Sequence, residues 1–103
     1  MNNKINILDN VSNINIVKKK ALKNYGTSDV KPSTRMLSSN KKYMIRNNEG
    51  KYIHFGDIRY EDYTHHKDKQ RRDNYLKRAV NMHGKWINDP FSPNWLSILL
   101  LWA

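Results

Sequence analysis

The sequence predicts a small single domain of the α+β class, with one β-hairpin, an amphipathic helix and a short hydrophobic C-terminal helix after a flexible basic arm. Three observations support this prediction. The chain has 103 residues, which is enough for one domain at most. Nine of the eleven aromatic residues lie at or after Tyr52. The net charge is +7 in residues 1–42 and only +3 in residues 43–103, so the basic charge gathers where the aromatic residues are scarce.

The distribution of charge and aromatic residues divides the chain at residue 41. Residues 1–41 are predicted to be a basic, largely flexible arm and linker, and residues 42–103 to be the folded domain. The arm has isoleucine and valine separated by asparagine, which is a poor strand former. Disorder, a short helix and an added strand therefore stay open for its first part, and residues 26–42 have the composition of a linker.

The clearest element is a β-hairpin over residues 43–56. Asn47-Asn48-Glu49-Gly50 is typical of a type I turn whose glycine takes the left-handed conformation. This turn sets Ile45 opposite Ile53 and Tyr43 opposite Phe55, which gives the ribbon one apolar side. The other side then holds Met44, Arg46, Tyr52 and His54. A two-stranded ribbon is marginal in water, so its apolar side must be covered.

The next helix is predicted to provide that cover. Asp68 is suited to its N-cap and Gly84 to the position after its last turn. Its apolar arc contains Tyr75, Leu76, Ala79, Val80, Met82 and His83. Arg72 projects into this arc. We interpret Arg72, with Tyr60 and Tyr63, as joining the preceding loop to the helix, through pairing of Arg72 with Asp57, Glu61 or Asp62 or through packing of its aliphatic stem.

The last element begins at Ser92-Pro93, an N-cap hydroxyl followed by proline at the first helical position. The apolar run that follows is far shorter than the roughly 20 residues needed to cross a bilayer. It predicts a buried C-terminal helix or one face of an oligomer, with an anchor at a membrane surface as the less favoured alternative. The residues predicted for a protein interface are Trp95, Leu99 and Trp102.

Nothing in the sequence predicts catalysis, a metal site or a cofactor. The chain has no cysteine, which excludes a disulfide scaffold, a cysteine-ligated zinc site and a thiol nucleophile. The densest polar stretch, residues 60–68, includes His65 and His66, but adjacent side chains diverge and rarely bind one ion together. Nucleotide-binding and catalytic motifs such as GxGxxG, the P-loop and HExxH are missing. We therefore interpret residues 60–68 as a structural loop.

The net charge of +10 favours a nucleic-acid partner, because phosphate contacts by Lys and Arg release counterions. Tyr52 and His54, on the polar side of the hairpin, could also stack on bases. Excess positive charge attracts acidic proteins and anionic lipids as well, so an acidic partner stays open. The residues predicted to make these contacts are Lys18, Lys19, Lys20, Arg71, Lys77 and Arg78.

Several phrases between residues 42 and 102 together resemble a family of short basic proteins encoded by large nucleocytoplasmic DNA viruses. They are His54-Phe55-Gly56, Tyr60-Glu61-Asp62-Tyr63-Thr64, His66-Lys67-Asp68, Arg71-Arg72, Tyr75-Leu76-Lys77-Arg78 and the closing Trp95-Leu96…Leu100-Leu101-Trp102. The resemblance implies a viral origin, a virion or virus-factory setting in the host-cell cytoplasm, and other viral structural proteins as partners. It supplies no catalytic or binding residue. The chain departs from the family at Ala79, where the family tends to have histidine, and at Ala103, where relatives often continue with a polar tail.

These inferences together predict a non-catalytic, small viral structural or packaging protein that binds nucleic acid or an acidic partner through basic residues. The alternative is a minor capsid or cement-type interaction module that uses the C-terminal Trp and Leu face and associates with itself or with other structural proteins.

Overall fold

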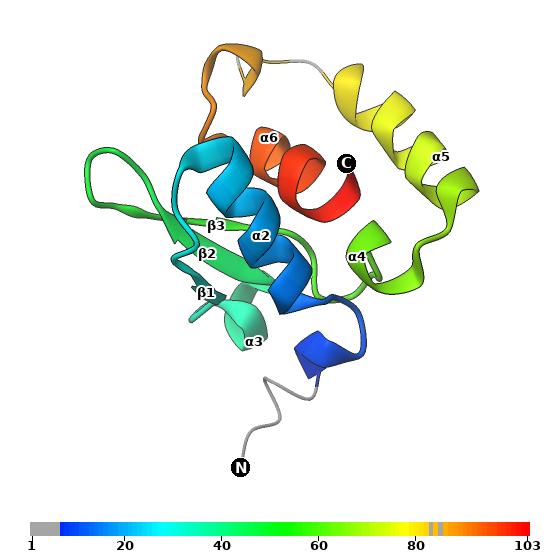
Figure 1. The fold of residues 1–103 in the computed structure, drawn as a ribbon, viewed down its shortest axis with the longest axis horizontal. Helices are drawn as coiled ribbons and strands as arrows, with labels where there is room; N and C mark the ends of the chain where they lie inside the picture. Colours follow the sequence, from blue (N-terminus) through cyan, green and yellow to red (C-terminus); the bar gives the residue numbers. More distant parts are fainter. Residues whose placement is uncertain (1–6, 83, 85) are drawn as a thin grey trace.

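The sheet has three antiparallel strands in the order β1-β2-β3, and it is drawn with the rest of the computed structural model in Figure 1. The structure describes residues 7–82, 84 and 86–103. The strands are β1 (Val30–Pro32), β2 (Tyr43–Arg46) and β3 (Tyr52–Phe55). The helices are α2 (Ile14–Tyr25), α3 (Met36–Ser39), α4 (Tyr63–His66), α5 (Lys69–Val80) and α6 (Pro93–Ser97), with a 3-10 turn η1 (Trp86–Asn88) and a π-helical turn η2 (Ile98–Trp102). This is the predicted α+β class in one small domain.

The β2–β3 hairpin has the predicted register. Tyr43 pairs with Phe55 and Ile45 with Ile53. The turn closes as expected: Gly50 has a φ of 80°, and its N–H donates to the Asn47 carbonyl oxygen at 3.1 Å. A side chain at a positive φ would strain the backbone, so glycine stabilises this turn.

Strand β1 was not predicted, and it extends the hairpin into a sheet. Val30 pairs with Ile45 and Pro32 with Tyr43. Val30, Tyr43, Ile45 and Phe55 are all buried, so these strands share one apolar face.

That face is covered by α2 and the C-terminal helix. Val17 and Ala21 of α2 are buried in the same core as Tyr43 and Phe55 of the sheet. The C-terminal helix adds Leu96, Leu100 and Leu101 to this core. In Figure 1, α2 crosses the sheet and α6 lies beside α2. The C-terminus lies between α2 and α5. The predicted burial of the C-terminal helix is confirmed.

The prediction that the helix after Asp68 covers the hairpin is wrong. Val80 and Met82, which were placed in its apolar arc, are 56% and 57% exposed. Helix α5 instead packs on the end of the C-terminal helix, where Tyr75 stacks on Trp102 with ring centroids 4.3 Å apart. The C-terminal helix is apolar nearly all round and fills the place beside the sheet, so α5 meets that helix and not the strands.

The division at residue 41 also differs from the structure. Residues 7–41 contribute Leu8, Val17, Ala21, Val30 and Met36 to the same core as the hairpin, so this part of the predicted arm belongs to the domain. Residues 1–6 of the arm lie outside the described residues. The short helix, one of the alternatives for the arm, is present as α2. Asn13 caps its start, where the Asn13 Oδ1 accepts hydrogen bonds from the backbone N–H groups of Asn15 and Ile16.

Two of the three predicted helix ends are confirmed. Ser92 Oγ accepts a hydrogen bond from the Trp95 N–H at 3.2 Å, and Asp68 Oδ1 accepts from the N–H groups of Gln70 and Arg71. The end assigned to Gly84 is wrong, because α5 stops at Val80 and its cap is Asn81. His83, which the prediction placed in the same helix, lies outside the described residues. Across the part of the chain that the structure describes, no helix has the length and apolar character needed to span a membrane.

Candidate nucleic-acid interface

The face of the sheet away from the core carries basic and aromatic side chains. Strand alternation places Lys31, Met44, Arg46, Tyr52 and His54 on it, and we call these five residues the open sheet face. The register sets Lys31 opposite Met44, Met44 opposite His54, and Arg46 opposite Tyr52. All five side chains are exposed or half-buried. Three short strands therefore bring side chains that lie far apart in the sequence onto one surface.

Tyr52 is held between two cations at one end of this face. The Arg46 guanidinium lies 4.9 Å from the Tyr52 ring centroid, and its Nη2 donates a hydrogen bond to the phenol oxygen at 2.9 Å. Lys31 Nζ donates to the same oxygen at 3.3 Å. These two hydrogen bonds lower the pKa of Tyr52, because they favour its anionic form. Asp29 lies 3.7 Å from Lys31 Nζ and offsets part of the positive charge.

His54 marks the other end of the open sheet face. Its Nδ1 is 2.7 Å from Ser33 Oγ. Burial lowers the pKa of His54, and the positive charges of Arg35 and Lys41 lower it further. Arg35 is exposed and Lys41 half-buried. Cations therefore stand beside both aromatic side chains of this face, an arrangement suited to phosphates and stacked bases.

The three lysines predicted as contacts on the arm all lie on α2, which packs on the opposite, buried face of the sheet. Lys18 and Lys19 are exposed. Lys20 is half-buried: its Nζ donates to the backbone oxygen of Ala103 and lies 5.8 Å from the ring centroid of Tyr63. Burial lowers the pKa of Lys20. Lys20 thus ties α2 to the end of the C-terminal helix.

The three predicted contacts on α5, Arg71, Lys77 and Arg78, are all exposed. Arg71 Nη1 lies 3.4 Å from a Glu61 carboxylate oxygen. The same carboxylate accepts from His65, with 2.7 Å between His65 Nδ1 and Glu61 Oε1. These hydrogen bonds lower the pKa of Glu61, so the carboxylate stays charged and balances Arg71.

Arg72 pairs with none of the three predicted carboxylates, because Asp57, Glu61 and Asp62 pair with Arg59, Arg71 and Lys42 instead. The Arg72 guanidinium lies over the Tyr63 ring, 5.2 Å from its centroid, so Arg72 and Tyr63 do join the loop to the helix. Tyr60 takes no part in that contact. Its side chain is 63% exposed beside Arg59.

A groove of about 1040 Å³ lies among α5, the segment that follows the sheet and the C-terminal helix. Arg71 and Arg78 line it from α5, and Lys41 and Tyr60 line it from the segments next to the sheet. Trp102 and Tyr75, which stack on each other, also line the groove. The two predicted arginines thus share a groove with aromatic side chains, whereas Lys77 does not line it.

The residues predicted for a protein interface are half-buried and largely engaged within the domain. The Trp95 indole N–H donates to the Ile87 carbonyl oxygen at 2.9 Å. Trp102 lies between Tyr75 and His66. Leu99 packs against the core. These contacts account for much of the apolar surface that the sequence placed at an interface.

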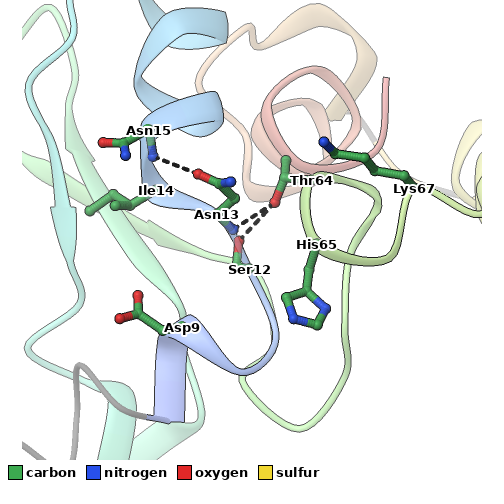
Figure 2. A pocket seen from close by; sticks show the side chains of 8 residues that line it. All are labelled: Asp9, Ser12, Asn13, Ile14, Asn15, Thr64, His65 and Lys67. Atoms are coloured by element: carbon green, nitrogen blue, oxygen red, sulfur yellow. Dashed lines mark hydrogen bonds between the residues drawn. The ribbon is translucent and has the colours of Figure 1, made fainter.

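A smaller polar pocket of about 320 Å³ opens beside the start of α2 (Figure 2). In this view Asp9 and His65 lie on its two sides, and the Thr64 hydroxyl lies above them. The polar atoms at its back bond to one another: Thr64 Oγ1 accepts from the Asn13 N–H at 2.9 Å and lies 3.2 Å from Ser12 Oγ. The pocket is therefore the edge of a structural network. Residues 7–82, 84 and 86–103 contain no group of three or more His, Asp or Glu side chains placed to hold a metal ion.

Part of the chain is similar to a known protein family. Residues 29–79 match the model of a family of unknown function, DUF5754. The match takes in 51 of the 103 residues, from the start of the sheet almost to the end of α5, so it includes the open sheet face and omits α2 and the C-terminal helix. The description of this family names no activity and no source organism. No curated protein and no solved structure matches the chain.

Part of this candidate interface was predictable from the sequence. Hairpin alternation placed Arg46, Tyr52 and His54 on one polar side, and the structure agrees. It missed Lys31, Arg35 and Lys41, which lie in the stretch that resembled a linker. The alternation of Val30 and Lys31 before Pro32 was too short to indicate a strand, because a three-residue strand is recognisable only by its partner.

Proposed function

We propose that this protein is a non-catalytic nucleic-acid-binding protein that contacts its ligand through the open sheet face. The observation that carries the proposal is Tyr52 held between Arg46 and Lys31, with donor distances of 2.9 and 3.3 Å to its phenol oxygen. Cations positioned around an aromatic ring on an exposed sheet supply phosphate contacts and a stacking surface together.

The charge distribution supports this surface over the one predicted on α2. Lys18 and Lys19 are exposed, but they lie on a helix that presents no aromatic ring beside them in the described contacts. The open sheet face combines charge with Tyr52 and His54. Nucleic acid is favoured over an acidic protein because flat aromatic rings stack on bases, whereas an acidic protein needs the charge alone.

Packaging within a virion is part of this proposal and rests on the resemblance of residues 42–102 to viral proteins. The alternative of a capsid or cement-type module gains no support from the predicted interface, because Trp95 and Trp102 have partners within the domain.

The test measures fluorescence anisotropy of labelled DNA and RNA oligomers across a salt series. In Lys31→Gln/Arg46→Gln we expect affinity to fall about tenfold or more and the dependence on salt to become shallower, because two phosphate contacts are lost. The matched control is Lys18→Gln/Lys19→Gln, which removes the same charge from the opposite side of the domain and should change affinity less than about threefold. Equal losses in the two variants, or no binding by the unmodified chain at low salt, would overturn the proposal.

A further inference from the structure

We propose that the ligand is a single nucleic-acid strand whose path continues from the open sheet face, past Lys41, into the groove beside α5. This inference rests on the proposed function and adds the class of nucleic acid and a second part of its binding site. It uses the basic and aromatic residues of the groove that the sheet face does not include.

A chain of hydrogen bonds runs from His54 to Lys41 through the buried Ser33. His54 Nδ1 lies 2.7 Å from Ser33 Oγ, and that oxygen accepts a hydrogen bond from the Arg35 N–H at 2.9 Å. The Arg35 carbonyl oxygen in turn accepts from the Lys41 N–H at 3.3 Å. Lys41 lines the groove. The positive charge of Lys41 is also close enough to His54 to lower the pKa of that ring, so Lys41 lies near both the open sheet face and the groove.

The groove has the size and lining of a binding site. Its volume of about 1040 Å³ is slightly above the usual range for ligand pockets, which leaves room for several nucleotide units. Tyr60 lines it and is 63% exposed, with the Arg59 guanidinium 5.8 Å from its ring centroid, so the rest of the ring is open to solvent. Asn74 and Asn94 add amide groups able to donate and accept hydrogen bonds.

The acidic residues of the groove do not cancel its positive charge. Asp57 is held by Arg59, with 2.8 Å between the charged atoms, and Glu61 by Arg71 at 3.4 Å. Lys41 and Arg78 form no ion pair within 4.0 Å among the described residues. These two cations are therefore available for phosphates at the entrance of the groove and along α5.

The aromatic residues along this path favour a single strand over a duplex. Tyr52 and His54 lie on the open sheet face and Tyr60 lines the groove, and aromatic rings stack on bases that are not already paired and stacked. A duplex presents mainly its phosphates to the protein and would leave the rings without a partner.

The experiment compares labelled single strands of about 4 and about 12 nucleotides, a range that covers the site sizes of small single-strand-binding folds, with a duplex of the longer length. DNA and RNA versions of each oligomer are included, and their relative affinities identify the sugar that is preferred. The variants are Arg78→Gln and Tyr60→Leu. Lys77→Gln is the matched control, because it removes one charge from an exposed neighbour on α5 that does not line the groove. Melting temperatures confirm that each variant is folded.

We expect the longer strand to bind the unmodified chain at least about tenfold more tightly than the shorter strand and than the duplex. Arg78→Gln and Tyr60→Leu should each weaken the longer strand about fivefold or more and leave the shorter one unchanged, while Lys77→Gln should change both little. If strands of both lengths bind equally and Arg78→Gln has no effect, the groove path is wrong while the sheet-face function stands. Equal affinity for the duplex overturns the single-strand class. If no oligomer binds at all, the proposed function fails.

Discussion

The ammonium group of Lys42 lies 2.9 Å from the Asp62 carboxylate, and the two side chains are only 2% and 0% exposed. Asp62 Oδ1 also accepts from the Thr64 N–H at 3.0 Å and from the Thr64 hydroxyl. Ser12 extends the network: its oxygen lies 3.2 Å from Thr64 Oγ1 and accepts from the Tyr43 hydroxyl at 2.7 Å. The pair therefore links the segment before α2, the start of β2 and the N-cap of α4.

Replacing Lys42 with methionine is expected to lower the free energy of unfolding by about 3 kcal/mol, because it leaves the Asp62 charge buried without its partner. Urea denaturation of Lys42→Met measures this loss. The control is Lys51→Met, an exposed lysine on the same hairpin, which should change stability by less than about 0.5 kcal/mol. Adding Asp62→Asn to Lys42→Met should recover part of the loss, and a double variant no more stable than the single one would contradict this account.

The two hairpin glycines allow a matched test of close packing. Gly56 has a φ of 82°, and a Cβ there would lie 2.9 Å from Lys42 Cβ and 3.0 Å from Leu101 Cδ1. Gly50 has nearly the same φ of 80°, with nothing within 4 Å of such a Cβ. Gly50→Ala should cost about 1 kcal/mol from backbone strain alone. Gly56→Ala should cost about 1–3 kcal/mol more, because it also overpacks the core. Equal losses of thermal stability in the two variants would show that the close approach at Gly56 is relieved easily.

Residues 42–103 alone are expected not to fold. The fragment lacks Val17, Ala21, Val30 and Met36, so the apolar face of the hairpin loses much of its cover. Circular dichroism and the dispersion of amide proton resonances compare this fragment with residues 7–103, which keep every described residue of the core. A well-dispersed spectrum from the short fragment would restore the division at residue 41.

Acidification is expected to destabilise the protein before its carboxylates titrate. The pKa of His54 lies below its ordinary value of 6.5 because of burial and the positive charges of Arg35 and Lys41, and burial also lowers the pKa of His66. The unfolded chain then binds these protons more readily than the folded chain. The free energy of unfolding therefore falls as the pH drops below about 6.5 and levels off below the folded-state pKa values.

The carboxylates of Asp57 and Glu61 do not interfere in this range, because their pKa values are lowered from ordinary values of 3.8 and 4.5. Urea midpoints measured from about pH 7.5 to about pH 5 give the slope of the free energy of unfolding against pH. His54→Gln should make it shallower, and His54→Gln/His66→Gln should nearly abolish it. An unchanged slope in the double variant would exclude these histidines as its cause.

The parts of the fold that were predictable depend on local chemistry. The turn at residues 47–50 sets the hairpin register by itself, and the caps at Asp68 and Ser92 need only the next three residues. These signals survive in any tertiary context, because the hydrogen bonds close within a few residues of one another.

The unpredicted parts depend on partners distant in the sequence. The asparagines around Ile14 and Ile16 obscured the helical pattern of α2. The buried residues of this helix are Val17 and Ala21, and they are covered only by the sheet and the C-terminal helix. Lys42 stood in a basic stretch that resembled a linker, and its ion pair forms only with Asp62, twenty residues later. Charge and composition cannot indicate that such a lysine lies in the core.

The contact of α2 with the C-terminal helix has a consequence for synthesis. Val17 is made early, but Leu100 and Leu101, which complete its core, follow more than eighty residues later. At translation rates of about 5–20 residues per second, the interval is roughly 4–17 s. In the part of that interval after Phe55 has been made, the nascent chain exposes the apolar sides of α2 and the hairpin together. The core can be completed only once Leu101 has left the ribosome. Until then, chaperones can bind the exposed apolar residues.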